Sequence, residues 1–439
     1  TQVGSSAASD VYKRQLLTFR LFHHLYPRLI KEKANFVYQN IDLPLVEVLS
    51  SIEANGIEVN KKFLTSLSNE FENESKKLEK NIYKLSKEEF NIGSPKQLGE
   101  ILFVNLKIPG GKKTKSGTYS TDSSTLNNLA SDGFEIAQLV LDWRELTKLK
   151  STYTDALFRL TDGKSRVHTS FGLANTLTGR LSSTDPNLQN IPIRTENGKK
   201  IRTAFVSGKG KKLVSFDYSQ IELRLAAEIS SDKNFIKAFK NNEDIHASTA
   251  KEIFNLNDSQ INNDYRRKAK AINFGLMYGM TAFGLTRQLG ISRNDAQMYL
   301  DSYFSKYDGV LKYMNEIREQ ARKKHYVETI FGRRVHVPEI NSGNGLRKKA
   351  AERAAINGPI QGSAADIIKK AMLDVNQWIQ ENSSIKMIMQ VHDELVFEVD
   401  ENFKDSCCKS IKEIMEKAVT LDVPLVVDIN HGNNWDEAH

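Results

Sequence analysis

Two aspartates of this chain each stand at the end of an apolar, strand-like run. Asp217 follows residues 213–216 and precedes a helical pattern, while Asp393 lies between two apolar runs that predict a strand–turn–strand hairpin. Turns favour aspartate for local hydrogen bonding, so either site alone is more often structural. Brought together, the two carboxylates are suited to hold two Mg²⁺ ions roughly 3.5–4 Å apart, because Mg²⁺ takes few protein carboxylates and keeps several waters.

A helical stretch between these aspartates carries cations and aromatics on one face. The residues recur every four positions, on one slowly drifting face: Arg266, Lys270, Phe274 and Tyr278. The cations are suited to grip a triphosphate, Phe274 to lie against a sugar or base, and Tyr278 to stack near a template base. An ordinary amphipathic helix separates cations from its buried stripe, so the pattern favours a functional face. Phosphoryl transfer requires carboxylates that hold metal ions, cations that bind the phosphates, and a surface that aligns the reacting groups.

The composition fits a chain of two or three packed subdomains. It has 439 residues, 39% of them hydrophobic, and a net charge of +8. The length exceeds one ordinary domain, and the charge favours a polyanionic partner, although many mildly basic proteins bind no nucleic acid. The only cysteines are the neighbours Cys407 and Cys408, so a reduced, intracellular protein without a zinc site is expected. No apolar run reaches the length of a membrane span.

Apolar periodicity places helices and strands in separate blocks. Helices are expected over 19–36, 40–60, 61–88, after Ser94-Pro95, around Trp143, over 221–324, and before Val423. Strands are expected from Val167 on, within 326–335, on both sides of Asp393, and over 423–429. Residues 1–14 show no periodicity and are expected to form a tail, and the long helical pattern before 380 is expected to break at Pro359. The blocks indicate an α+β fold with a helical insertion, not a doubly wound sheet.

These segments resemble the motifs of family A DNA polymerases, of the bacterial DNA polymerase I type and its Klenow-like polymerase region. Five segments carry the likeness: 213–222 (motif A), 266–279 (motif B), 389–397 (motif C), and two further signatures over 178–192 and 351–362. The similarity runs in unbroken order from about Leu16 to His439. Motifs of this length are highly specific.

The resemblance implies a right-hand polymerase fold with an antiparallel-sheet palm, helical fingers and a helical thumb. The implied divisions are 1–15 as a tail or sequencing remnant, 16–41 as a remnant of the exonuclease-domain C-terminal helix, 42–155 as thumb, 156–222 and 347–439 as palm, and 223–346 as fingers. The basic loop 109–117 then lies near the thumb tip. By composition alone it is better explained as a surface loop, although a cationic tip that closes on a phosphate backbone is the alternative. The acidic exonuclease motifs are absent from the chain, so proofreading is not expected from it.

The resemblance also implies a reaction and its ligands. The 3′-OH of a primer attacks the α-phosphate of a dNTP and releases pyrophosphate, with two Mg²⁺ ions (Mn²⁺ is expected to substitute) at Asp217, Asp393 and the carbonyl of Tyr218. Glu394 is implied as a secondary carboxylate, and Lys270 as a proton donor to the leaving pyrophosphate. The dNTP-binding set is Arg266, Lys270, Phe274, Tyr278, Gln220, Glu222 and His246. Within it, Glu222 is the steric gate, which occupies the space that a ribose 2′-OH needs.

Contacts with the primer-template are implied for a second set of residues. They are Arg180, Gln189, Asn190, Arg353, Gln361 and His392. Several of them are expected to reach the minor groove, where the hydrogen-bond acceptors are nearly alike in all base pairs. Without the resemblance, Arg353 and Gln361 are better explained as solvated residues on a helix surface.

Two other functions remain alternatives. A single-subunit RNA polymerase shares the fold, but Glu222 argues against it, because such an enzyme must leave room for the 2′-OH. A catalytically inactive nucleic-acid clamp is disfavoured because every expected acid is present. The expected partners are primer-template DNA and dNTP, with no membrane, and the protein is expected to be a monomer. It is expected in the bacterial cytoplasm, either associated with the nucleoid or encoded by a phage.

The resemblance generates one prediction about the sugar of the nucleotide. A phenylalanine at the position of Phe274 resembles family members that discriminate against chain-terminating dideoxynucleotides. We therefore expect Phe274→Tyr to raise the incorporation of ddNTP relative to dNTP. Competitive single-nucleotide extension of a labelled primer measures the ratio, and the same ratio in parent and variant would refute the prediction.

Overall fold

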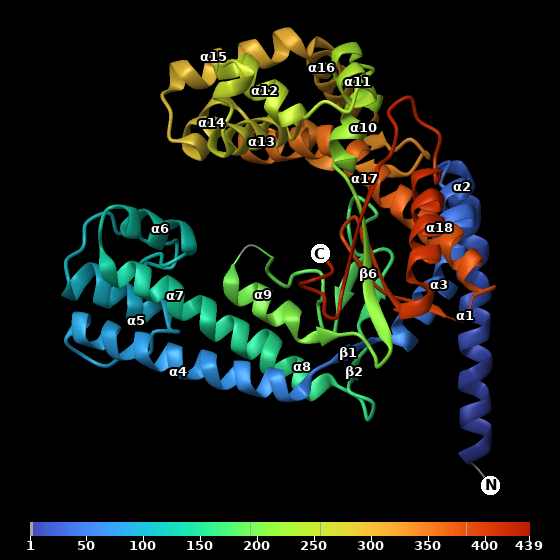
Figure 1. The fold of residues 1–439 in the computed structure, drawn as a ribbon, viewed down its shortest axis with the longest axis horizontal. Coiled ribbons are helices and arrows are strands. Elements are labelled where there is room, and N and C mark those ends of the chain that lie inside the picture. The colour runs from blue at the N-terminus through green and yellow to red at the C-terminus, as the bar shows by residue number, and fades with distance from the viewer. Residues whose placement is uncertain (1–2, 194, 255, 383) are drawn as a thin grey trace.

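A four-stranded antiparallel sheet lies at the centre of the computed structural model, which describes residues 3–193, 195–254, 256–382 and 384–439. Its strands, in spatial order, are β11 (Val427–Gly432), β6 (Lys211–Tyr218), β10 (Glu394–Asp400) and β9 (Ile385–Val391). The expected hairpin around Asp393 is therefore confirmed as β9 and β10. Figure 1 shows β6 between two helical groups that extend from it.

Alternation along the strands gives this sheet one apolar face and one face that mixes acids with apolar residues such as Leu213 and Val396, which are buried in a second apolar cluster. Val214 and Phe216 of β6, and Leu395 and Phe397 of β10, belong to the main core, which also includes residues of α17 (Gly345–Ile379) and α18 (Lys404–Glu416). Successive side chains of a strand point to opposite faces. Ser215, Asp217 and Glu394 are therefore directed to the other face, away from this core.

A helical arm extends from one end of the sheet. It is built from α4 (Lys61–Ser86), α5 (Pro95–Glu100), α6 (Ser123–Ser131), α7 (Glu135–Leu149) and α8 (Asp155–Leu160). Side chains cap two of these helices, since Asn60 accepts from the backbone N–H of Phe63 and Ser94 accepts from that of Gln97. The arm has its own apolar core near its far end, where Figure 1 shows α5 and α6.

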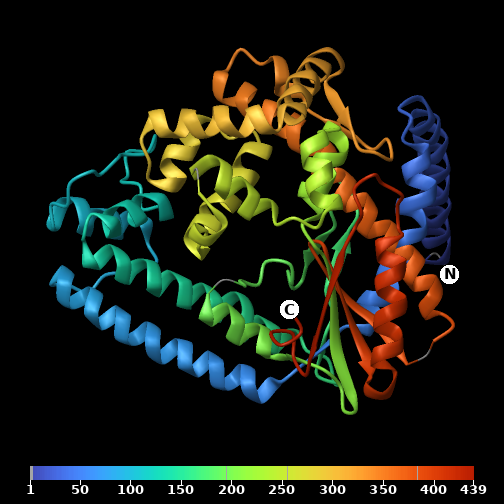
Figure 2. The same cartoon turned by 45° about the horizontal axis from the view of Figure 1, so that its top comes forward.

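A second helical group follows β6. It comprises α10 (Ile221–Ser230), α11 (Lys233–Lys240), α12 (Ile245–Phe254), α13 (Asn263–Met277), α14 (Ala282–Leu289), α15 (Arg293–Lys306) and α16 (Asp308–Lys324). The expected helical stretch over 221–324 is thus divided into separate helices. The short hairpin β7 (Tyr326–Glu328) and β8 (Arg334–His336) comes next. In the turned view of Figure 2 this group lies across from the arm, with the sheet joining the two.

The remaining elements connect these groups. They are α2 (Asn35–Val37), α3 (Leu43–Asn55), β1 (Ile57–Val59), β2 (Arg166–Val167), β3 (Ser170–Gly172), β4 (Ser182–Thr184), α9 (Glu196–Thr203) and β5 (Phe205–Val206). Strands β2, β1 and β5 form one small sheet, and β3 pairs with β4. Among the described helices, none is long and apolar enough to cross a membrane.

Helix α1 (Val3–Lys31) starts well before residue 19, where the sequence predicted its beginning. The segment expected to be a tail over 1–14 is helical from Val3 onward. Apolar residues such as Val11, Leu17 and Phe22 are exposed on it. Residues 10–25 of this helix are all exposed, and a helical segment that buries no side chain needs no apolar stripe.

The break expected at Pro359 is also wrong. Helix α17 runs without interruption from Gly345 to Ile379 and contains Pro359. Proline removes one backbone donor but leaves the rest of the helical hydrogen bonds in place. Ala355, Ile356 and Ile360 are buried on both sides of it, so packing holds the two halves in line.

The apolar face of the sheet gives a stability prediction. The rings of Phe216 and Phe397 meet edge to face with centroids 5.3 Å apart, and both side chains are fully buried. We expect Phe397→Ala to lower the free energy of unfolding by about 3–5 kcal/mol, the usual result of emptying an aromatic core site. The control is Phe283→Ala on α14, where the ring is 68% exposed and a change within about 0.5 kcal/mol is expected. Urea unfolding followed by circular dichroism measures both, and equal losses would contradict the assignment of the core.

Candidate active site

The two aspartates of the sequence analysis lie next to each other at the end of the central sheet. Asp217 of β6 stands directly opposite Glu394, the first residue of β10. Asp393 occupies the turn just before Glu394, and its carbonyl accepts a hydrogen bond from the backbone N–H of Tyr218 at 3.2 Å. Opposite residues of an antiparallel pair point to the same face, about 4.5–5.5 Å apart at Cβ. Pairing of β6 with β10 thus brings Asp217, Tyr218 and Asp393 together.

Crowding of acids changes the protonation of this site. Burial, followed by the charges of Glu394 and Asp393, raises the pKa of Asp217 to about 7. Burial also raises the pKa of Asp393. Such carboxylates gain most from a nearby divalent cation, so the donor set suits Mg²⁺. No group of three or more Asp, Glu, His or Cys within the described residues forms a metal cage, and Mg²⁺ usually binds by one or two carboxylates together with substrate phosphates.

The carboxylate of Glu394 differs from the others because protein donors surround it. Ser215 Oγ donates to Oε1 at 2.6 Å, Trp435 Nε1 donates to the same oxygen at 3.3 Å, and His439 Nδ1 lies 3.2 Å from Oε2. Burial alone would raise the pKa of Glu394, but the hydrogen bond and charge of His439 outweigh it and lower that pKa. Glu394 is therefore an anchored anion beside Asp217. Sequence reasoning missed this set of donors.

Arg180 and Glu222 form an ion pair at the start of α10. Arg180 Nη2 donates to Glu222 Oε1 at 2.5 Å, and Glu222 is 9% exposed. Burial raises the pKa of Glu222 to about 7, while the charge of Arg180 partly offsets that effect. Gln220, the residue before α10, has a left-handed backbone with φ of 53°. It places its side-chain oxygen in a buried position without a hydrogen-bond partner among the described residues.

The loop that carries Arg180 rests on a buried ion-pair network. Arg333 donates to both carboxylate oxygens of Asp42, at 2.8 and 2.9 Å, and its Nε donates to Asp366 at 2.8 Å. Gly179 has φ of +79°, and a Cβ there would come within 2.7 Å of the Arg333 side chain. Glycine is thus required for the loop to pass this close to the network. The network was not predicted, because its members are far apart in the sequence.

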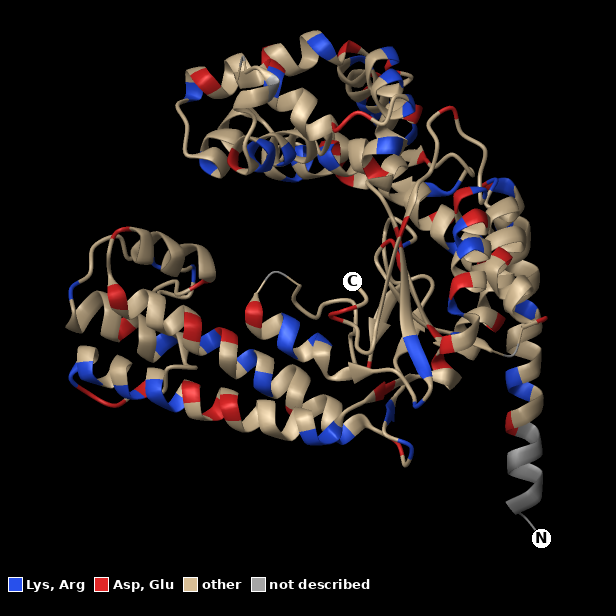
Figure 3. Cartoon of the chain, viewed as in Figure 1, with Lys and Arg blue, Asp and Glu red and all other residues tan. Residues whose placement is uncertain are grey.

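Helix α13 presents the expected row of cations and aromatics. Arg266 Nε donates to Asp244 Oδ2 at 2.7 Å, and Lys270 is exposed. The ring centroids of Phe274 and Tyr278 are 6.1 Å apart. Figure 3 shows Lys and Arg gathered on α13. The row is therefore accessible, and its first cation already has an anionic partner.

His246 joins this row from the neighbouring helix α12. Its ring centroid lies 6.0 Å from that of Phe274, and only 2% of the residue is exposed. Burial lowers the pKa of His246 to about 4, so the ring is neutral at physiological pH. The expected nucleotide-binding residues on α12 and α13 thus lie together.

The residues expected to contact DNA occupy several elements around the sheet. Gln189 Nε2 donates to Gln390 Oε1 at 3.0 Å, and Gln390 in turn donates to the carbonyl of His392 at 2.5 Å. The carbonyl of Asn190 accepts from the Tyr153 hydroxyl at 2.6 Å. On α17, Arg353 is exposed and Gln361 is half-buried. The structure therefore links Gln189 to the β9–β10 turn, while Arg353 and Gln361 lie two helical turns apart.

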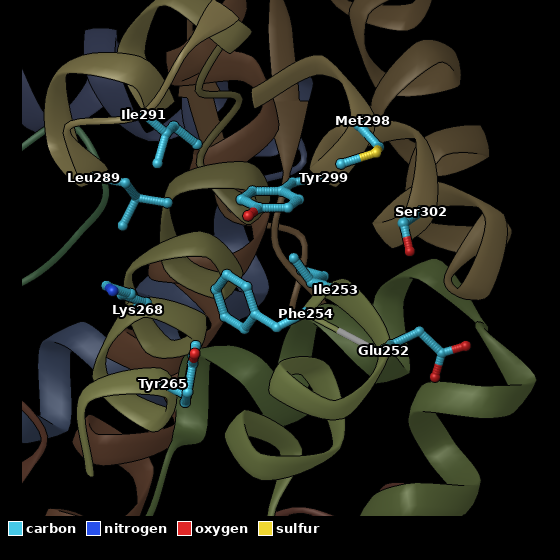
Figure 4. Close-up of a pocket in the computed structure, with 10 residues that line it drawn as sticks. All are labelled: Glu252, Ile253, Phe254, Tyr265, Lys268, Leu289, Ile291, Met298, Tyr299 and Ser302. Carbon is cyan, nitrogen blue, oxygen red and sulfur yellow. The ribbon is translucent and has the colours of Figure 1, made fainter. Parts of the chain in front are cut away.

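A cavity of about 570 Å³ lies elsewhere on the second helical group. Phe254, Tyr265 and Tyr299 line it together with Lys268 (Figure 4). Lys268 is held by Asp264 at 2.8 Å. None of the expected site residues lines this cavity, so it is separate from the acids of the sheet.

Comparison with known proteins gives consistent matches over nearly the whole chain. The profile of DNA polymerase family A matches residues 61–437. DNA polymerase I of Pseudomonas aeruginosa is 49% identical over 442 aligned residues, which cover 100% of this chain and 48% of the relative. DNA polymerase I of Rhizobium leguminosarum is 49% identical, with 96% of this chain and 42% of the relative covered. The chain thus spans about half the length of the curated relatives it matches.

Solved structures include a similar fold. The structure described as the POL domain of Pol1 from M. smegmatis, in complex with DNA primer-template and dNTP, superposes with a TM-score of 0.91. It is 41% identical, and the match covers 96% of this chain and 74% of that one. The α+β polymerase fold inferred from the sequence is confirmed by this likeness. The chain belongs to DNA polymerase family A.

Proposed function

We propose that this chain is a template-directed DNA polymerase that adds dNMP from dNTP to the 3′-OH of a primer. The observation that carries the proposal is the meeting of Asp217 and Asp393 at one end of the sheet, in surroundings that raise the pKa of both carboxyls. The relatives named DNA polymerase I and the M. smegmatis complex with primer-template and dNTP support it. Primer-template DNA and dNTP are accordingly the proposed partners of a monomer that works in the bacterial cytoplasm.

The divisions of the right-hand fold are proposed on the same basis. Residues 42–155 would be the thumb, 223–346 the fingers, and 156–222 with 347–439 the palm. The arm and the second helical group correspond to the first two ranges, except that α8 ends at Leu160 and α10 begins at Ile221. Residues 16–41 would be the end of an exonuclease domain. The match to the polymerase family occupies 61–437, so we expect these 439 residues to extend primers without proofreading.

Asp217, Asp393 and the carbonyl of Tyr218 are the proposed ligands of two Mg²⁺ ions, with Mn²⁺ as a substitute. When bound, these ions lower the pKa of the attacking hydroxyl and neutralise charge on the phosphates. Glu394 adds negative charge beside Asp217, but its oxygens already accept hydrogen bonds from Ser215 and Trp435. We therefore propose that Glu394 is the secondary carboxylate of the site, held in place by these donors.

The cations of α13 would bind the triphosphate. Arg266 must share or leave Asp244 to do so, because the two are paired at 2.7 Å. Lys270 Nζ would donate a proton to the oxygen of the departing pyrophosphate. Phe274 and Tyr278 would position the sugar and base, and closure of α13 would align the nucleotide when pairing is correct.

Glu222 would select the sugar by occupying the space of a 2′-OH. Its side chain is buried and held by Arg180, so it is not free to move aside without breaking that pair. The same observation disfavours an RNA polymerase, the second candidate function.

Replacement of the two aspartates tests the proposal and separates it from an inactive clamp. We expect Asp217→Asn and Asp393→Asn each to lower primer extension about 10³-fold or more, since several kcal/mol of charge stabilisation are lost. Binding of primer-template, measured by fluorescence anisotropy, should remain. The matched control is Asp400→Asn at the other end of β10, which should extend primers normally. If the parent chain binds primer-template but does not extend the primer, the protein is an inactive nucleic-acid clamp and not a polymerase.

Substitution of Glu222 tests the steric gate. Glu222→Ala should weaken discrimination of dNTP over NTP about 10- to 200-fold, the usual range for a change in pocket shape. Glu222→Gln has nearly the same volume without the charge, so it should keep most of the discrimination. The ratio of kcat/KM for the two nucleotides measures the effect. If the glutamine variant loses as much as the alanine variant, charge and not volume sets the sugar preference.

A further inference from the structure

A chain of three buried polar side chains connects α12 with α13. Thr249 Oγ1 donates to Asn273 Oδ1 at 3.0 Å, and Asn273 Nδ2 lies 3.0 Å from His246 Nδ1. Thr249 is 1% exposed, Asn273 0% and His246 2%. Polar groups this deeply buried are costly unless they are paired, so their arrangement is specific.

The hydrogen bonds determine which ring nitrogen of His246 carries the proton. A neutral imidazole has one N–H donor and one acceptor nitrogen. The amide of Asn273 directs its Nδ2–H toward Nδ1 because its oxygen accepts from Thr249. With the amide in this orientation, a proton on Nδ1 would face another donor, so Nδ1 is the acceptor and the proton resides on Nε2. The reversed amide, with the Thr249 hydroxyl as acceptor, would instead place the proton on Nδ1.

The other nitrogen of the ring is open. No hydrogen bond from Nε2 to the described residues is found, and Nε2 is not among the fully buried polar atoms without a partner. The ring lies beside Phe274 and interacts electrostatically with Asp244, Arg266 and Lys270. An Nε2–H group here is therefore a hydrogen-bond donor next to the row formed by Arg266, Lys270 and Phe274.

We propose that Asn273 is a positioning residue that, with Thr249, fixes His246 in the Nε2–H tautomer, so that the ring presents a neutral donor to a phosphate oxygen of the incoming nucleotide. The part about the nucleotide rests on the proposed function. The opposite tautomer would direct a lone pair at the phosphate and repel it. Burial keeps the ring neutral, so His246 adds a directed hydrogen bond and leaves the charge to Arg266 and Lys270.

The tautomer is measurable without any nucleotide. In two-bond ¹H–¹⁵N spectra of the whole chain labelled with ¹⁵N-histidine, the Nδ1–H, Nε2–H and imidazolium forms give different patterns. His246 is assigned by the signal lost in His246→Gln. We expect the Nε2–H form at neutral pH. The Nδ1–H form or an imidazolium would overturn the proposal, whether or not the chain proves to be a polymerase.

A matched pair of variants tests the role of the amide orientation. Thr249→Val keeps the shape but removes the hydroxyl that holds the amide, so the pure Nε2–H pattern should be lost. Thr249→Ser keeps the hydroxyl and should keep the pattern. An unchanged spectrum in the valine variant would contradict the proposal.

A double-mutant cycle then measures the consequence for dNTP. Asn273→Leu should raise KM for dNTP about tenfold with a smaller change in kcat, the loss expected for one hydrogen bond to a charged group. In the His246→Gln background the same substitution should have little further effect, because no imidazole remains to be oriented. Equal tenfold increases in both backgrounds would mean that Asn273 acts only through packing.

Discussion

Antiparallel pairing of β6 with β10 is the constraint on which the site depends. It places Asp217 opposite Glu394 and beside Asp393, so three carboxylates meet in partly or fully buried positions. Like charges in such a place raise one another's pKa. Glu394 is surrounded by donors, whereas no side-chain donor to Asp217 or Asp393 is found among the described residues. A divalent cation at this place would neutralise the negative charge of Asp217 and Asp393.

The register of this pair is fixed by the apolar side of the same strands. A slip of β6 by one residue would turn Asp217 into the core and Phe216 toward the face that carries the acids. Phe216 and Phe397 are fully buried against each other, so a slip would separate the two rings and remove Phe216 from the core. The apolar core and the acid cluster are thus consequences of one alignment. Helices α17 and α18, which share that core, hold the alignment from behind.

Local sequence patterns predicted the parts of the site that depend on spacing along the chain. The strand before Asp217, the hairpin at Asp393 and the four-residue repeat on α13 follow from periods of two and 3.6 residues. Resemblance to the family identified Arg180, Glu222 and His246, which no period singles out. The part of α1 before residue 19 and the unbroken course of α17 were missed. Exposed residues leave no apolar pattern, and packing overrides a single proline. The donors to Glu394 and the Thr249–Asn273–His246 chain join distant residues, so only the folded structure could reveal them.

Mn²⁺ binding, followed by electron paramagnetic resonance, tests the central claim most directly. The complex would contain the chain, a primer-template with a dideoxy end, and dNTP, so that no reaction occurs. Shared coordination by Asp217 and Asp393 predicts two tightly bound ions in the parent chain and weakened binding when either residue becomes asparagine. The same two ions, bound equally tightly in both variants, would contradict it.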